Sequence, residues 1–479
     1  MEMLEQLLDR IVSRVNVCLR ELNYNIEGHV RHVIPANKFL QFHAFYGLTP
    51  YKKLHFYIKS SSLAGSSLLG KCTVHFSVLY KSHLRGDELK NQGETLPYIG
   101  FQIPVYEDEV VRIKDSFLIK SLIHSHSHDP ENPDEFLIKN TVSMHYANIH
   151  GSPVIGCFLA PFSTVDMSTF RNCVIGTFSY VQVRRLTHQL VEPGRIWIKD
   201  GESFEFDYHF PAGVVDRYIS LEPGSVPKGI FIDFVEQREE DWEPILEMAR
   251  YEPPNADFAA TAAFSRYAVA KGETKILENV YVAQGAYLED AYMGKGSNAQ
   301  ENCYIIKSRL DGNVVTAHGG KVIHCQLGSH VFVGFNSFLN GKEKCPIKVG
   351  EESIVMPHTI IDADEPLDIP PRHLVWGYIG SRRDLEQNCV HLNDFARFSG
   401  NLKRGDLSFS GNGFAFVRAF KHRIEHILEL NGAFFDGMTK SGHIHRIRDA
   451  SFNTIQPYYG GPLKGLFADM DIHPLDDVV

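Results

Sequence analysis

Short aliphatic segments punctuated by glycine recur along two stretches of the chain. Within residues 136–186 they include VIGCFLAPF and CVIGTFSYV, and after Met293 they include LGSHVF, VGFNSF, VGEESI and VMPHTI. The later segments begin with an aliphatic residue and have Val, Ser or Thr at the fifth position. A period of six belongs neither to a helix nor to a simple alternating strand. It predicts one flat strand per hexad, inward first and fifth side chains, and a tight corner that suits glycine.

The first 120 residues have a different pattern. Apolar residues of the segment 1–22, among them Leu4, Ile11 and Val15, share one face of a predicted amphipathic helix that packs on its own domain or on a neighbouring subunit. Charged residues interrupt this segment, so we expect neither a signal peptide nor a membrane span. Alternating runs such as KLHFYIKS and CTVHFSVLY then indicate short strands.

The change of pattern along the chain predicts five parts. They are an N-terminal α+β unit at 1–120, first coils at 121–185, an insertion at 186–272, the main repeat at 273–380 and a helical C-terminal cap at 381–479. The cap is predicted from RRDLEQNCVHLNDFARF and GFAFVRAFKHRIEHILELNG, whose apolar spacing is helical and whose final Asn-Gly ends the second helix.

The hexads resemble the hexapeptide-repeat family, in which three hexads form one triangular coil. The resemblance covers about residues 136–186 and 275–380, with frame slips near 310 and 322. It implies a mainly β fold: a left-handed parallel β-helix with an N-terminal α+β unit and a helical C-terminal cap. Family members assemble as homotrimers, which we therefore expect for this chain.

Composition narrows the functional classes. The 479 residues carry a formal net charge of −10, which disfavours a broad nucleic-acid surface. Eight cysteines occur without a C-x-x-C pair, which argues against a disulfide framework and fits the reducing cytoplasm. No Walker A or Rossmann fingerprint is present in the sequence. We expect a cytoplasmic protein with small-molecule partners and without nucleic-acid or membrane partners.

Three histidines, His318, His324 and His330, follow one another at intervals of six residues. On a coil of hexads this spacing places them on three different faces. One chain therefore cannot gather all three around a metal ion. In the expected frame they point outward, where a second subunit would complete a cleft.

The segment HCQLG, beginning at His324, resembles the HDCTVG segment of hexapeptide acyltransferases. The resemblance implies an acyl-CoA or acyl-carrier donor and an acceptor amine or hydroxyl on a sugar, nucleotide sugar or related metabolite. It also implies that a histidine acts as general base. His324 is the first candidate. It stands one residue closer to its glycine than the family pattern places the histidine, so His318 is the second candidate. Asn336 and backbone N–H groups at the corners would hold the acceptor or the oxyanion.

The end of the repeats, VWGYIGSRR, occupies the place where family acyltransferases receive coenzyme A. Gly377 and Gly380 would lie along the pantetheine, although the usual G-x-P-A pattern is missing. Arg372, Arg382 and Arg383 would bind its phosphates through their forked donors. For acyl transfer we expect no metal-ligating residue.

Two other functions are compatible with the sequence. HGGKVIHCQLG resembles the HGAVLHGCTIG segment of γ-class carbonic anhydrases, which would make the chain a zinc protein if His145, His150 or His188 supplied a third ligand. A non-catalytic binding or scaffold protein is the other alternative. The run LIHSHSH, with His124, His126 and His128, is an H-x-H pattern that we interpret as an exposed loop in preference to a metal site.

Overall fold

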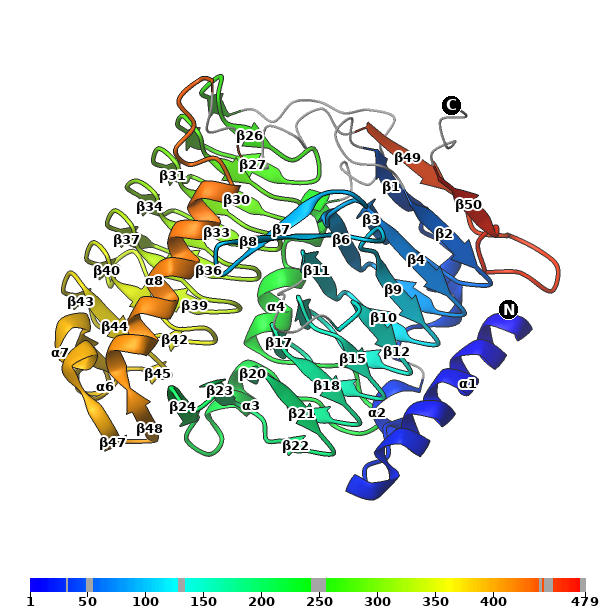
Figure 1. Cartoon of the computed structure of the whole chain (residues 1–479), viewed down its shortest axis with the longest axis horizontal. Helices are drawn as coiled ribbons and strands as arrows, with labels where there is room; N and C mark the ends of the chain where they lie inside the picture. Colours follow the sequence, from blue (N-terminus) through cyan, green and yellow to red (C-terminus); the bar gives the residue numbers. More distant parts are fainter. Residues whose placement is uncertain are drawn as a thin grey trace. The chain divides into compact units, whose positions relative to one another are not determined.

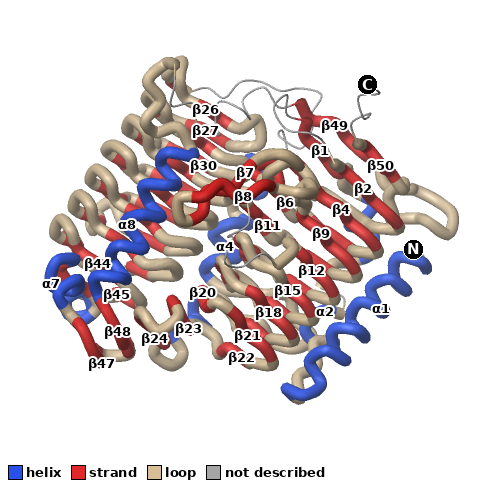
Figure 2. The backbone as a smooth tube through the Cα atoms, viewed as in Figure 1, coloured by secondary structure: helices blue, strands red, loops and turns tan. Residues whose placement is uncertain are grey.

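Two coils of short parallel strands make up most of the protein, whose computed structural model describes residues 1–31, 33–48, 55–127, 134–242, 256–438, 442 and 451–473. They belong to two compact units (Figures 1 and 2). Unit 1 comprises Met1–Gly194, Ile219–Gly229 and Asp449–Val479, and unit 2 comprises Arg195–Tyr218 and Ile230–Arg448.

Unit 1 winds through three parallel sheets in turn, here called A, B and C. In sheet C, Val142 pairs with Phe158 and Phe158 pairs with Val174, so one coil takes 16 residues. The strands of sheet A are β1 (Ala44–Leu48), β3 (Ser67–Gly70), β6 (His83–Glu88), β11 (Leu122–His126), β14 (Asn148–His150), β17 (Thr164–Asp166) and β20 (Tyr180–Val183).

Sheets B and C complete the coil of unit 1. Sheet B contains β2 (Phe56–Lys59), β4 (Cys72–His75), β9 (Val111–Lys114), β12 (Leu137–Lys139), β15 (Val154–Ile155), β18 (Thr169–Arg171) and β21 (Arg185–Thr187). Sheet C contains β5 (Val78–Tyr80), β10 (Phe117–Ile119), β13 (Val142–Ser143), β16 (Phe158–Leu159), β19 (Val174–Ile175) and β22 (Leu190–Val191). A hairpin of β7 (Thr95–Tyr98) and β8 (Phe101–Pro104) leaves the coil between β6 and β9.

Unit 2 repeats the arrangement with sheets G, H and I. Most of its coils take 17 residues, as in the pairing of Lys275 with Tyr292 and of Tyr292 with Arg309. Sheet G contains β25 (Asp257–Phe258), β28 (Lys275–Ile276), β31 (Tyr292–Met293), β34 (Arg309–Leu310), β37 (Cys325–Leu327), β40 (Ile347–Val349) and β43 (Leu367–Ile369).

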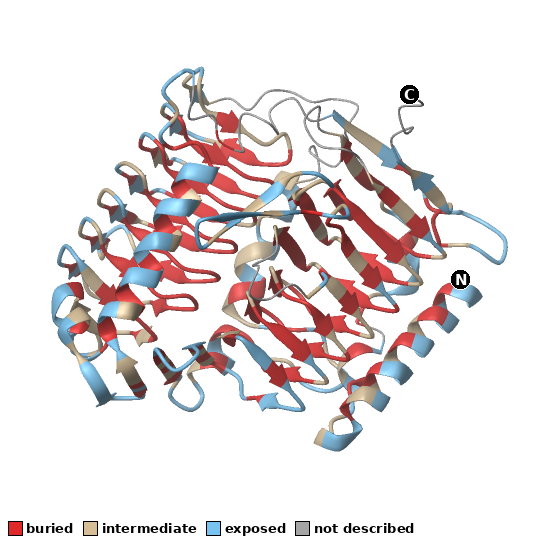
Figure 3. Cartoon of the chain, viewed as in Figure 1, coloured by how far each residue is buried: buried red, intermediate tan, exposed pale blue. Residues whose placement is uncertain are grey.

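The other two sheets of unit 2 carry the segments with the strongest hexad pattern. Sheet H contains β26 (Ala263–Phe264), β29 (Tyr281–Val282), β32 (Asn298–Ala299), β35 (Val315–Thr316), β38 (Phe332–Val333), β41 (Ile354–Val355), β44 (His373–Val375) and the antiparallel β46 (Cys389–His391). Sheet I contains β27 (Val269–Lys271), β30 (Tyr287–Glu289), β33 (Tyr304–Ile306), β36 (Lys321–Ile323), β39 (Phe338–Asn340), β42 (Ile360–Ile361) and β45 (Tyr378–Ile379). Their inward aliphatic side chains form one continuous buried core, and Figure 3 shows these strands as mostly buried.

Left-handed residues turn the corners between sheets. Gly319 has φ +74°, and a Cβ atom built there would lie 2.2 Å from Oδ1 of Asn336, the corner residue one coil later. Asn302 stands in the same relation to Gly285. Glycine and asparagine tolerate this backbone region best, and only glycine leaves room for the neighbouring amide.

The glycines of LGSHVF and VGFNSF have a different cause: Gly328 and Gly334 are not left-handed, and a Cβ atom there would lie 2.7 and 2.3 Å from the backbone nitrogens of Glu351 and Pro357. Close approach of the next coil therefore explains glycine at these hexad positions.

Helix α1 (Glu2–Leu19) covers the outer surface of sheet C in unit 1 (Figure 1). Its buried face includes Leu7, Ile11 and Val15, which belong to one apolar cluster with Phe117 and Phe158. The prediction of an amphipathic helix packed on its own domain is therefore confirmed. The short helix α2 (Glu27–Val30) follows it.

Aromatic side chains fix the elements outside the coil of unit 2. Helix α4 (Ile230–Glu236) places Phe231 5.2 Å from Phe338 of sheet I, measured between ring centroids. Helix α8 (Gly413–Leu430) stacks Phe416 on Phe206 at 5.6 Å. The other elements of unit 2 outside its coil include α3 (Val214–Tyr218), α6 (Arg382–Gln387), α7 (Leu392–Arg397) and the antiparallel strands β23 (Arg195–Asp200), β24 (Phe204–His209), β47 (Ser399–Arg404) and β48 (Leu407–Asn412).

The coils begin and end at other residues than the predicted boundaries between the five parts. Coiling in unit 1 begins at β1, well inside the segment 1–120, and the segment 186–272 contains the end of one coil and the start of another. The segment 381–479 holds helices, but its last strands β49 (Ser451–Ile455) and β50 (Met470–Ile472) pair antiparallel with β1 and β2. Short alternating strands occur in a coil as well as in a hairpin, so the alternating pattern alone does not distinguish the first coils from a separate α+β unit.

We expect Gly319→Ala to lower the free energy of unfolding by about 1–3 kcal/mol, because alanine disfavours the left-handed backbone and crowds the Asn336 amide. Denaturant unfolding of the two proteins measures the difference. Gly312→Ala is the matched control, since its nearest atom would be the Lys295 carbonyl oxygen at 3.4 Å and its backbone is not left-handed. Equal losses in both variants would contradict the corner argument.

Candidate functional site

A column of polar side chains runs across sheet A of unit 1. Arg85, His124, His150 and Asp166 are register partners on four neighbouring strands. The residues just before them on all four strands, for example Ile149, are buried core residues, so the polar column faces away from the coil interior. All four are nevertheless at least 91% buried. Buried polar side chains are costly unless they are paired, which marks this column as a candidate site.

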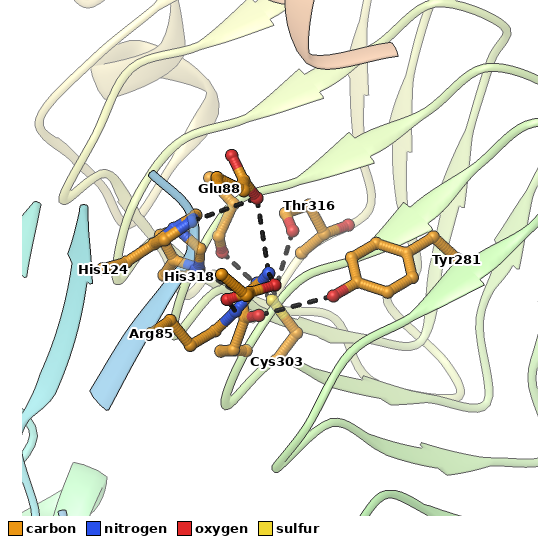
Figure 4. Close-up of polar contacts among 10 residues, drawn as sticks. Arg85, Glu88, His124, Tyr281, Cys303, Thr316 and His318 are labelled. Atoms are coloured by element: carbon orange, nitrogen blue, oxygen red, sulfur yellow. Dashed lines mark hydrogen bonds and ion pairs between the residues drawn. The ribbon is translucent and has the colours of Figure 1, made fainter. Parts of the chain in front are cut away.

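Carboxylates hold the histidines of the polar column. His150 Nδ1 lies 2.7 Å from Asp166 Oδ1, and the Tyr180 hydroxyl donates to the other Asp166 oxygen. His124 Nε2 lies 3.3 Å from Glu88 Oε1, and Arg85 donates to the same Glu88 oxygen at 3.3 Å (Figure 4). Burial lowers the pKa of His150 to about 3, although Asp166 acts in the opposite direction. His150 is therefore a neutral imidazole at pH 7.

Unit 2 presents a second histidine and carboxylate pair. His318 is 98% buried and its Nδ1 lies 2.8 Å from Oε2 of Glu301, the residue at the same position one coil earlier. The Tyr281 hydroxyl donates to the other Glu301 oxygen at 3.5 Å. The Phe335 ring lies 5.2 Å from the His318 ring on the following coil. Figure 4 shows Tyr281 and His318 in this part of unit 2.

A buried lysine lies beside this pair along the chain. Lys321 is 98% buried and donates from Nζ to the Gly319 carbonyl oxygen at 2.8 Å. Its ammonium lies 5.9 Å from the Tyr304 ring centroid. Burial lowers the pKa of Lys321 to about 8. Lys321 thus adds a titratable cation two residues beyond the corner that follows His318.

The predicted histidines lie at successive corners of the unit 2 coil. His324 and His330 have left-handed backbones, with φ of 47° and 57°, whereas His318 directly precedes the left-handed Gly319. His324 is half-buried and His330 is exposed. Asn336 is 98% buried over Gly319, and its backbone N–H donates to the His318 carbonyl at 2.9 Å.

The predicted coenzyme A residues lie at the end of the unit 2 coil. Gly377 adjoins the Tyr208 ring, where a Cβ atom would lie 2.2 Å from Cζ, so close packing explains this glycine. The Gly380 N–H donates to Asp384. Arg372 and Arg382 form ion pairs with Glu352 and Glu365, at 3.1 and 3.2 Å, and Arg383 is exposed in the first turn of α6.

The H-x-H run is a strand rather than a loop. His124 and His126 lie on β11, with an irregular register between them, and His128 lies outside the described residues. The interpretation of this run as an exposed loop was therefore wrong for His124 and His126. The loop is inferred from the proline-rich residues that follow the run. Leu122 and Ile123, which precede the histidines, are apolar and begin a buried strand.

The sequence analysis missed Glu301, Asp166 and Glu88. Glu301 precedes His318 by 17 residues and Asp166 follows His150 by 16, which are the coil lengths of their units. A search of the sequence for ionisable residues separated by one coil length would have identified both histidine and carboxylate pairs. Glu88 would not have been found in this way, because the hairpin β7–β8 and the irregular register of β11 interrupt that spacing.

Comparisons place the chain in a family. Residues 101–223 match the family "Hexapeptide repeat including loop". A protein from Desulfovibrio desulfuricans G20, provisionally named an acetyltransferase, has a crystal structure with a TM-score of 0.93 and 51% sequence identity, covering 99% of this chain and 100% of that one. The chain belongs to the hexapeptide-repeat transferase superfamily.

Two further structures match a smaller part of the chain. A protein of Bacillus cereus, also provisionally named an acetyltransferase, has 14% identity and a TM-score of 0.24, over 38% of this chain and 95% of that one. A hexapeptide transferase family protein from Anaplasma phagocytophilum has 15% identity and a TM-score of 0.27, over 38% and 93%. The chain has no match among curated proteins. Within the described residues, no helix has the length and apolar character needed to span a membrane.

Buried histidines predict acid sensitivity of unit 1. His145 is 93% buried, and burial together with Lys120 lowers its pKa to about 3. The unfolded chain takes up this proton near pH 6.5, so the stabilisation is complete above that pH and is lost as the pH falls toward 3. We expect His145→Leu to reduce the slope of unfolding free energy against pH by up to about 1.4 kcal/mol per pH unit between pH 6 and 4.

Urea unfolding at several pH values measures this slope. The exposed His43 provides the control substitution, His43→Gln. A slope that is the same in wild type and His145→Leu would contradict the buried neutral state of His145.

Proposed function

We propose that the protein is an acyltransferase that moves an acyl group from coenzyme A or an acyl carrier to an amine or hydroxyl of a sugar, nucleotide sugar or related metabolite. Membership of the superfamily and the name of the relative at 51% identity support acyl transfer. The observation that carries the proposal is the buried pair of His318 and Glu301, with Nδ1 and Oε2 2.8 Å apart.

His318 is the general base in this proposal. The Glu301 carboxylate lies 2.8 Å from Nδ1, where its charge favours a proton on Nδ1 and so favours the tautomer whose Nε2 can accept a proton. As the acceptor's nitrogen or oxygen bonds to the thioester carbon, its proton passes to Nε2. The carbon–sulfur bond then breaks, and the imidazolium returns the proton to the departing thiolate. The Tyr281 hydroxyl, which donates to Glu301, favours the ionised carboxylate throughout.

His324 is the alternative base. His324 lies at a left-handed corner and is partly exposed, so the surrounding chain holds its ring in place less firmly than it holds the buried His318. The Asn336 backbone N–H donates to the His318 carbonyl, and its side-chain oxygen lies where a Cβ atom of residue 319 would be crowded. We therefore assign Asn336 a positioning role at His318, in addition to the predicted role toward the acceptor.

Coenzyme A would bind at the end of the unit 2 coil. Its phosphates would lie near Arg372, Arg382 and Arg383, and its pantetheine near Gly377 and Gly380. The ion pairs of Arg372 and Arg382 with glutamates show that these guanidinium groups accept anionic partners, and phosphates would replace those carboxylates. Assembly as a homotrimer is part of the proposal and is tested by the solution mass.

A thermal-shift screen of CoA thioesters and nucleotide sugars identifies a substrate pair, after which the base is tested by kinetics. We expect His318→Gln to lower kcat/KM by about 100-fold or more, because proton removal is lost. Glu301→Gln is expected to lower it by at least about 10-fold, because the tautomer is no longer fixed. We expect His324→Ala to change it by less than about 3-fold.

Gln326→Ala, an exposed residue of the same coil, is the control. A large loss in His324→Ala with none in His318→Gln would transfer the role of base to His324. Unchanged turnover in both histidine variants would reject the proposed chemistry.

A further inference from the structure

We propose that His124, His126 and His150 of unit 1 form a binding site for a divalent transition metal, with zinc as the best-matched ion. This inference concerns the coil of unit 1 and does not rest on the acyl transfer proposed for His318 in unit 2.

The three rings lie together on two neighbouring strands. The ring centroids of His124 and His150 are 5.2 Å apart, and those of His126 and His150 are 5.3 Å apart. A nitrogen of His124 lies within 4.8 Å of one of His150. Tetrahedral zinc with nitrogen ligands at 2.0–2.1 Å spaces those nitrogens about 3.3 Å apart. The nitrogens of His124 and His150 are grouped within 4.8 Å, whereas His126 is placed near them by its ring alone, so it is the His126 side chain that would turn to complete the site.

A glycine forms the corner next to the cluster. Gly151 has φ +55°, and a Cβ atom there would lie 3.4 Å from Cε1 of His126 and 2.8 Å from Sδ of Met167. The crowded neighbour is therefore Met167, whereas 3.4 Å from the His126 ring is an ordinary contact distance. The corner directly after His150 thus lies beside the His126 ring.

Carboxylates orient two of the three imidazoles, as they do around protein-bound zinc. Asp166 holds Nδ1 of His150 at 2.7 Å, which leaves Nε2 as the ligand atom. Tyr180 in turn donates to Asp166. Glu88 holds Nε2 of His124 at 3.3 Å, which leaves Nδ1. Such carboxylate and histidine pairs fix the ring orientation and increase the basicity of the ligand.

The charge around the cluster also favours a cation. Asp87, Glu88 and Asp166 are carboxylates with 16% side-chain exposure or less, and Arg85, with 3%, is the cation paired with two of them. Carboxylates close to imidazole ligands favour a bound cation electrostatically. Imidazole ligands select zinc, cobalt or nickel over magnesium or calcium.

Metal binding is measured on the full-length protein without a histidine tag, after chelator treatment. We expect one zinc ion per chain by calorimetric titration and elemental analysis. Cobalt should give the intense visible absorption of tetrahedral nitrogen coordination, and magnesium should not compete. His150→Ala and His126→Ala should each lose the stoichiometric ion.

Asp166→Asn tests the site without removing a ligand. We expect it to weaken zinc binding by about 10- to 100-fold, the usual effect of losing an orienting carboxylate. Exposed His188 of the same unit supplies the control, and His188→Ala should bind like wild type. Circular dichroism establishes that each variant is folded. Absence of zinc binding by the wild type, or binding that persists in the folded His150→Ala and His126→Ala variants, overturns the proposal.

Discussion

Hydrogen bonding between successive coils is the constraint on which the rest of this structure depends. Because the strands of each coil pair in parallel with those of the next coil, a residue is most often aligned with those 16 positions away in unit 1 or 17 in unit 2. Aliphatic residues at inward positions then stack into a continuous core. Polar residues at outward positions stack into columns, so that one strand brings a base and the next brings its carboxylate.

Both units use this alignment to build histidine and carboxylate pairs from residues far apart in sequence. His150 with Asp166 and His318 with Glu301 have nitrogen–oxygen distances of 2.7 and 2.8 Å. Each pair is buried, where an ionised carboxylate is stable only with donors around it. Tyr180 and Tyr281 supply such donors in the two units. A buried histidine and carboxylate pair with a tyrosine donor thus occurs in both units, whose coils differ in length.

The sequence predicted the class of fold because the hexads of residues 316–338 repeat a strand, a corner and a glycine. The frame slips near 310 and 322 come from a coil of 17 residues, one short of three hexads, so the register moves at every coil. Coils before residue 120 escaped notice because a hairpin and longer strands interrupt their period. His318 was found from its motif, whereas Glu301 required the coil length, which only the strand pairing supplies.

The antiparallel strands β49 and β50 lie against β1 and β2, the first strands of their sheets in unit 1. An uncovered first coil would present unpaired amide and carbonyl groups to any other extended chain, which invites uncontrolled end-to-end association. Since the protecting segment follows unit 2 in the chain, unit 1 stays unprotected at that end while the ribosome makes unit 2. The first coil of unit 1 is therefore open to pairing with other extended segments throughout that interval.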